Sequence, residues 1–170
     1  MRWSGSLRIH APAAIVWDLI VKPELMTRYE PSVSQVHSLT GREGVGAQRW
    51  TMVQANGRAM VCEQFTSVWE VNRRVVATLT VGTSRVESEY ILVPTEPEQA
   101  VGFRDAAVQS TTDVRWSLAA TVWPPVLWAV MPFVLFAPLL LMTRIGRRHH
   151  EVLLRLGQVA EAEARAGAGA

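Results

Sequence analysis

A carboxylate within an aromatic segment is the first group in the sequence that could perform chemistry. Glu63 lies where Val61, Phe65 and Trp69 recur at alternate positions and would share its side of a β-strand. Burial among aromatic groups raises the pKa of a carboxyl group, so Glu63 could act as a general acid or base. If the opposite side of the strand faces the interior, Glu63 lies in solvent. That opposite side carries Met60, Cys62, Gln64, Thr66 and Val68.

Three further side chains could assist such a reaction. Tyr29 and Tyr90 carry hydroxyl groups that could orient a carbonyl group, and Arg49 could pair with a ligand carboxylate or enolate. Arg115 has the same potential as Arg49, although exposed arginines paired across strands are the simpler interpretation of both. Glu63, Tyr29, Tyr90 and Arg49 are therefore the candidate catalytic residues.

The sequence lacks the motifs of the common catalytic and metal centres. It contains no GxSxG, HExxH, P-loop or CxxC pattern. His149 and His150 are adjacent, and adjacent residues of a helix point about 100° apart, so the two rings do not converge on one ion. We interpret them as part of a solvated or headgroup-facing basic patch. The sequence therefore predicts neither a metal site nor a cofactor.

The hydrophobic pattern predicts the elements that must position these side chains. Its period is near 3.6 over the early helices and changes to 2 after residue 30. Hairpin-length connections indicate an antiparallel sheet, which must bury one apolar face, and only the C-terminal segment is long enough to cover it. In chain order we expect a strand over residues 2–10, helices over 13–21 and 24–29, and strands over 33–39, 47–54, 58–69, 74–81, 85–93 and 111–122.

No residue between Arg115 and Arg144 carries a charge. As a helix, residues 125–142 would measure about 27 Å, close to the roughly 30 Å hydrocarbon core of a bilayer. Pro132 and Pro138 would break or kink a helix that spans the bilayer. We therefore expect a monotopic insertion into one leaflet rather than a transmembrane span.

The expected membrane contacts combine aromatic and basic side chains, as at a bilayer interface. They are Trp123, Trp128, Phe136, Arg144, Arg147 and Arg148. Two other uses of the uncharged segment stay open: an interface in a homodimer or with another protein, and complete burial against the sheet.

Charge and cysteine content restrict the setting of the protein. The net charge is +2 and the excess follows Arg115, so composition gives no support for nucleic-acid binding. Cys62 has no partner for an internal disulfide, and the N-terminal residues lack the apolar core of a signal peptide. We expect a cytoplasmic protein, peripheral or monotopic at the inner face of the membrane. Its length predicts one domain over residues 1–165 and a flexible tail over 166–170.

Several local patterns resemble those of the START-like (SRPBCC) superfamily, and specifically its polyketide cyclase/dehydrase-like branch. They are IHAPAAIVWDLI at 9–20, PEL at 23–25, YEPSV at 29–33, GVG at 44–46, Gly57 with Glu63, TDVRW at 112–116 and LRLGQVAEAE at 154–163. The resemblance implies a helix-grip fold of class α+β, in which a curved antiparallel sheet of about seven strands accompanies two short N-terminal helices and a long, kinked C-terminal helix. Residues 95–110 are longer than that pattern requires, and residues 124–142 are more apolar.

The resemblance also implies a hydrophobic cavity between the sheet and the C-terminal helix, which the superfamily uses for lipids, sterols and polyketides. The residues expected to line it, which could equally fill a core, are Trp50, Trp116, Met60, Val114, Leu118, Trp128 and Phe133. The favoured function is binding of a lipid or polyketide-like small molecule at or near a membrane. One alternative is a polyketide aromatase/cyclase or dehydratase that uses the same cavity. Another is an interaction module that binds a partner through residues 125–142.

Overall fold

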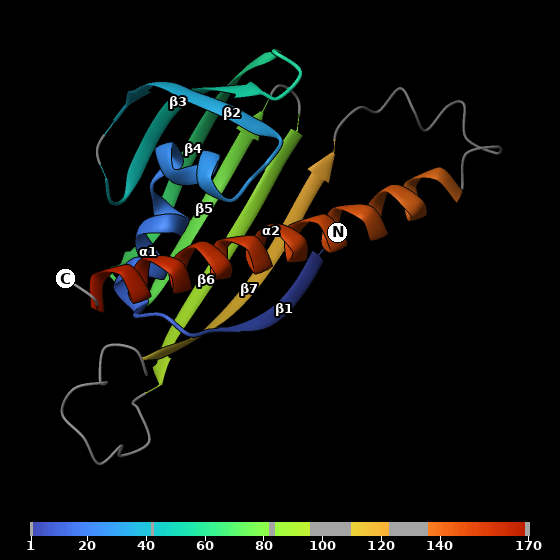
Figure 1. Cartoon of the computed structure of the whole chain (residues 1–170). Helices are drawn as coiled ribbons and strands as arrows, with labels where there is room; N and C mark the ends of the chain where they lie inside the picture. The colour runs from blue at the N-terminus through green and yellow to red at the C-terminus, as the bar shows by residue number, and fades with distance from the viewer. Residues whose placement is uncertain (1, 42, 82–83, 96–109, 123–135, 169–170) are drawn as a thin grey trace.

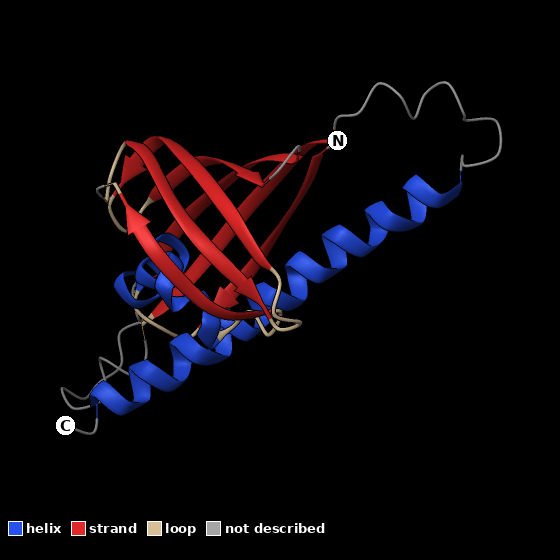
Figure 2. Ribbon diagram, turned by 90° about the horizontal axis from the view of Figure 1, so that it is seen from above, coloured by secondary structure: helices blue, strands red, loops and turns tan. Residues whose placement is uncertain are grey.

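The computed structural model describes residues 2–41, 43–81, 84–95, 110–122 and 136–168. Seven strands form one antiparallel sheet in the order β1-β7-β6-β5-β4-β3-β2. The sheet is strongly curved, and a long C-terminal helix lies along its concave side (Figures 1 and 2). The α+β helix-grip architecture expected from the sequence is thereby confirmed.

The seven strands and the two helices near the N-terminus begin and end within two residues of the positions that the hydrophobic pattern predicts. The short second helix is a 3-10 helix, labelled η1, that begins at a proline. In chain order the elements are β1 (Arg2–Ile9), α1 (Ala13–Val21), η1 (Pro23–Arg28), β2 (Val33–Thr40), β3 (Gly46–Gln54), β4 (Ala59–Glu70), β5 (Arg74–Val81), β6 (Ser84–Thr95), β7 (Thr111–Val122) and α2 (Phe136–Ala168).

The hydrophobic core lies between the concave face of the sheet and the two α-helices. On α2, small and aliphatic side chains at helical spacing form the buried stripe, namely Leu153, Leu156, Ala160 and Ala164. They belong to the same core cluster as residues of α1 and of β1, β6 and β7. We call the concave side of the sheet its inner face and the convex side its outer face.

A β-bulge divides β4 into two parts with opposite alternation. The pairing of β4 with β5 shifts register between Thr66 and Val68, so one extra residue enters β4. Cys62 and Thr66 face inward before the bulge, and Trp69 faces inward after it. Trp69 packs edge-on against Trp17 of α1, with ring centroids 5.1 Å apart. The expectation that Trp69 shares a side with Glu63 is therefore wrong, because the bulge reverses the parity between them.

Helix α2 runs as one element from Phe136 to Ala168. Pro138, which the sequence suggested as a kink, lies in its first turn, where no intrahelical N–H bond is lost. The N-terminal turns of α2 extend past the edge strand β1, away from the sheet (Figures 1 and 2). Within the described part of the chain, no helix combines the length and apolar character needed to cross a bilayer.

Candidate ligand-binding site

Two aromatic residues and a histidine meet where β6, β7 and α2 come together. Tyr90 of β6 is paired with Trp116 of β7, so both side chains stand side by side on the inner face. His149 of α2 packs edge-on against Trp116, with ring centroids 4.7 Å apart. The Tyr90 hydroxyl lies 3.4 Å from Nε2 of His149. The three side chains form a polar contact point in an otherwise apolar part of the interior.

Burial holds both titratable members of this group in their neutral forms. It lowers the pKa of His149 to about 4, and the neighbouring His150 adds to that shift while Glu30 opposes it. Burial also raises the pKa of the Tyr90 hydroxyl. At neutral pH the tyrosine can therefore donate a hydrogen bond to an uncharged imidazole that carries its own proton on Nδ1.

A groove of about 590 Å³ between β1 and α2 leads to Trp116. Trp3 and Gly5 form one wall, and Arg147 and His150 form the other. Gly5 is required there, because a Cβ atom on this residue would lie 2.8 Å from Cζ2 of Trp116. The indole is only 6% exposed, and its Nε1 has no hydrogen-bond partner among the described residues. A residue with a buried donor thus lines an open groove.

A second polar group lies on the inner face of β3 and β4. Trp50 pairs with Cys62, and the next inward pair is Gln48 with Gln64. Nε2 of Gln64 donates a hydrogen bond to the Thr66 hydroxyl over 3.2 Å. Trp50 is 3% exposed, and its indole Nε1 also lacks a partner within the described chain. The inner face therefore carries two buried indole donors, on β3 and on β7.

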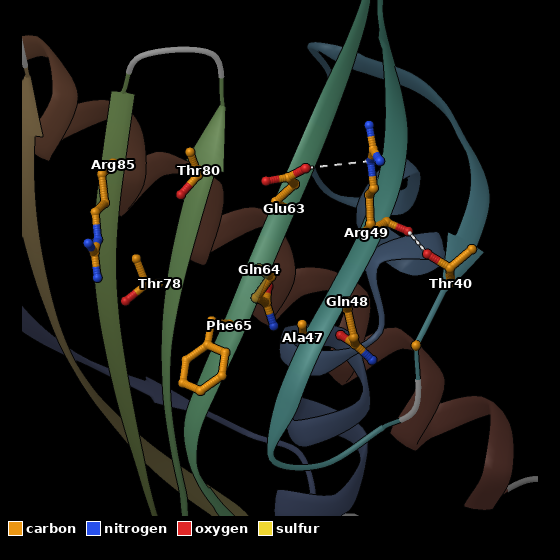
Figure 3. A pocket seen from close by; sticks show the side chains of 11 residues that line it. Thr40, Ala47, Gln48, Arg49, Glu63, Gln64, Phe65, Thr78, Thr80 and Arg85 are labelled. Carbon is orange, nitrogen blue, oxygen red and sulfur yellow. Dashed lines mark hydrogen bonds and ion pairs between the residues drawn. The ribbon is translucent and has the colours of Figure 1, made fainter.

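Glu63 and Arg49 lie on the outer face, not in the interior. They are cross-strand neighbours, and Arg49 Nε is 3.6 Å from Glu63 Oε1. Their side chains are 61% and 63% exposed, and with Thr78 and Thr80 they line a shallow pocket of about 440 Å³ (Figure 3). The interior environment that would make Glu63 an acid or base is thus absent, because the face of β4 that turns inward is the one with Cys62. Arg115 is exposed as well.

Tyr29 is buried, and its hydroxyl group already has a hydrogen-bond partner within the protein. Its hydroxyl donates a hydrogen bond to the Leu19 carbonyl oxygen over 2.9 Å, and the side chain belongs to the core. Burial raises the pKa of this hydroxyl too. Of the four residues proposed from the sequence for catalysis, Tyr90 is the one whose polar group meets another functional group on the inner face.

The structure describes five of the seven residues that the sequence analysis expects to line the cavity. Trp50, Trp116, Val114 and Leu118 are buried on the inner face, and Met60 is half-buried. Trp128 and Phe133 lie outside the described residues.

The residues proposed for membrane contact lie on or before α2. Arg147 and Arg148 are exposed, and Arg148 is 3.4 Å from a Glu30 carboxylate oxygen. Phe136 and Arg144 belong to the N-terminal part of α2. Trp123 and Trp128 fall outside the described residues.

His149 is the functional candidate that the sequence reasoning missed. The sequence groups it with His150 in a solvated patch, yet it contacts Trp116 and Tyr90. The spacing of His149, Leu153 and Leu156 is the spacing of one helix face and could have indicated this burial. Among the described residues, no group of three or more histidine, cysteine, aspartate or glutamate side chains is arranged to hold a metal ion.

Residues 2–161 match the family described as polyketide cyclase / dehydrase and lipid transport. The chain belongs to this family. No match was found among curated protein sequences.

Solved structures show the same fold at low sequence identity. A START superfamily protein from Mycobacterium smegmatis is 14% identical, with a TM-score of 0.59 over 96% of this chain and 97% of its own. A protein from Thermus thermophilus is 20% identical, with a TM-score of 0.63 over 96% of this chain and 99% of its own. The di-domain ARO/CYC protein BexL of the BE-7585A biosynthetic pathway is 18% identical, with a TM-score of 0.61 over 95% of this chain and 50% of BexL.

Proposed function

We propose that this family member binds an apolar small molecule between the inner face of the sheet and α2, and exchanges it at a membrane surface. The observation that carries the proposal is Trp116, which is buried, lines the groove between β1 and α2, and has an unpaired N–H group among the described residues. Leaving such a donor unpaired costs about 1–3 kcal/mol. A ligand oxygen that reaches Trp116 through the groove would remove that cost.

The proposal is tested by native mass spectrometry of protein purified without detergent. We expect a bound mass that organic extraction removes and that returns when the extract is added back. Trp116→Phe keeps an aromatic ring but removes the donor, so it should retain less of this ligand, whereas Trp69→Phe serves as a matched control on the inner face. Protein that is empty after purification and takes up nothing from a total lipid extract would contradict the proposal.

Exchange at a membrane is supported by the position of α2. Its N-terminal turns extend past β1, they carry uncharged residues up to Arg144, and exposed Arg147 follows. Anionic headgroups attract such a basic segment, at about 1 kcal/mol per arginine. We expect the protein to sediment with phosphatidylserine vesicles, less so as Arg147→Glu, and unchanged as the control Arg85→Glu on β6. Equal sedimentation of all three would contradict membrane docking.

A partner protein or a second copy on the uncharged segment stays a prediction. If such an interface forms between two copies, the molecular mass measured in detergent-free buffer should rise with protein concentration. Membrane docking instead predicts a monomer whose sedimentation depends on vesicles.

The alternative of a cyclase or dehydratase is favoured by the Tyr90–His149 contact. The Tyr90 hydroxyl, which burial keeps protonated, can donate a hydrogen bond to a substrate carbonyl group or its enolate, and Nε2 of His149 lies 3.4 Å from that hydroxyl and can orient it. The test is cyclisation of a poly-β-keto thioester, followed by the absorbance of the aromatic product. We expect His149→Gln and Tyr90→Phe to lose the activity and the outer-face control Glu63→Gln to keep it. A wild-type rate equal to that in buffer would contradict this alternative.

A further inference from the structure

Charged side chains are segregated to one face of the sheet. In the described strands, every Asp, Glu, Lys and Arg occupies a position whose side chain lies on the outer face, as the cross-strand pairing shows. Several of them pair there with one another, as in Arg8–Asp113, Arg49–Glu63 and Arg74–Glu89. The inner face of the same described strands carries none.

Among the titratable groups of the other described elements, Arg147, His150 and Glu151 of α2 line the groove beside β1, where Arg147 and His150 are exposed to solvent. His149 of α2 and Tyr90 of β6 are neutral at physiological pH because burial disfavours their charged forms. The Glu30 side chain is 13% exposed, but its carboxylate accepts hydrogen bonds from the backbone N–H and the hydroxyl of Ser32 and lies beside Arg148. An anion buried at the indoles of the inner face would therefore lose its hydration, and Arg147, the cation that lines the groove with Trp116, is itself exposed to solvent.

Two buried side chains of this face carry hydrogen-bond donors that are available to a ligand. The indole N–H groups of Trp50 and Trp116 can donate a hydrogen bond and cannot accept one. Each is more than nine-tenths buried and has no hydrogen-bond partner within the described chain. They therefore match ester, ketone, ether or hydroxyl oxygen atoms.

We infer that the ligand is a neutral molecule whose oxygen atoms accept hydrogen bonds from buried indoles, and that the inner face rejects the free carboxylates that fatty acids and similar metabolites carry. This inference rests on the proposed binding function and specifies its ligand class. It separates a lipid ester or neutral polyketide-like molecule from a free acid of the same hydrocarbon length.

The test compares three probes with one hydrocarbon chain: methyl palmitate, palmitate and hexadecane. Each is delivered from cyclodextrin, and its occupancy is measured by native mass spectrometry between pH 5.5 and 8. A carboxylic acid titrates about 2–3 units below neutral pH and would have to bind in its minor neutral form. We expect palmitate to bind about 100-fold more weakly than the ester at pH 7, and its affinity to rise about 10-fold for each unit that the pH falls.

The variant Trp116→Phe tests the donor separately. Loss of one neutral hydrogen bond should weaken methyl palmitate by up to roughly 10-fold and leave hexadecane unchanged. Trp69→Phe, at the ring that packs on Trp17, is the matched control, and circular dichroism checks the folding of both variants. Equal weakening of the ester and of hexadecane in Trp116→Phe would overturn the role of the N–H group.

The remaining outcomes distinguish the inference from the function on which it rests. If palmitate binds at pH 8 as tightly as the ester, the neutral ligand class is wrong and the binding function stands. If none of the three probes occupies the protein at any pH, the binding function is overturned and the inference with it.

Discussion

Gly5 determines where the Trp116 indole can lie. A Cβ atom at this position would be 2.8 Å from Cζ2 and 3.0 Å from Nε1 of the indole, both shorter than a van der Waals contact. Gly5→Ala should therefore push the ring off its site and lower the free energy of unfolding by about 1–3 kcal/mol. Urea denaturation measures this loss, and ligand occupancy should fall in parallel.

The control for that substitution is Gly167→Ala, near the end of α2, where an added Cβ meets nothing within 4 Å. It should leave stability unchanged or raise it slightly, since alanine favours helix. A loss at Gly5 no larger than the change at Gly167 would show that the indole can move freely.

His149 gives the protein a pH dependence of defined sign. Its pKa is about 4 in the folded protein against an ordinary value of 6.5, so the unfolded chain takes up the proton first. Stability from this residue is present above pH 6.5 and is lost as the pH falls toward 4. His149→Gln should flatten the decline of the urea midpoint in this window. The control is His37→Gln, which changes an exposed histidine of β2 and should leave the slope as in the wild type; parallel slopes in all three proteins would refute the assignment.

At the scale of elements, two leucines of α2 that are two positions apart in the sequence differ strongly in their exposure to solvent. Leu156 is 2% exposed, whereas Leu154 is 43% exposed. Leu156→Ala removes core contacts and should lower the free energy of unfolding by about 2–5 kcal/mol. Leu154→Ala should cost less than about 1 kcal/mol. Thermal or urea unfolding of the pair decides whether α2 closes the core as described, and equal losses would contradict it.

The sequence predicted elements well where one period persists. The alternation of β7 and the helical stripe of α1 place both elements where the structure has them, because each buries one continuous face. The sequence could not locate the bulge in β4, since no glycine marks it and Ser67 and Val68 suit either parity. Without the bulge, Trp69 and Glu63 would lie on the same face of β4. The inserted residue places Trp69 on the inner face and leaves Glu63 on the outer face, so the sequence pattern misplaced Glu63.

At the scale of the molecule, the family was recognisable from the order of its patterns, and the match over residues 2–161 confirms it. The candidate site was harder to predict, because it depends on which face of the sheet turns inward. Tyr90 and Trp116 could be selected as aromatic residues in strands, but their contact with His149 depends on the rotation of α2. A one-residue turn of that helix would move the imidazole about 100° around its axis.

The pairing of β1 with β7 joins the first and the last of the described strands: Arg2 lies opposite Ala119, and Ile9 lies opposite Thr112. During synthesis the first strand must therefore wait until the last strand has been made. Contacts of such high sequence separation slow folding, and meanwhile β1 and the edge of β6 expose unpaired backbone groups. In pulsed hydrogen exchange during refolding, the amides of β1 should gain protection together with those of β7. Protection of β1 before β7 would mean that it first pairs elsewhere, and the order of assembly would then differ from the order of the sheet.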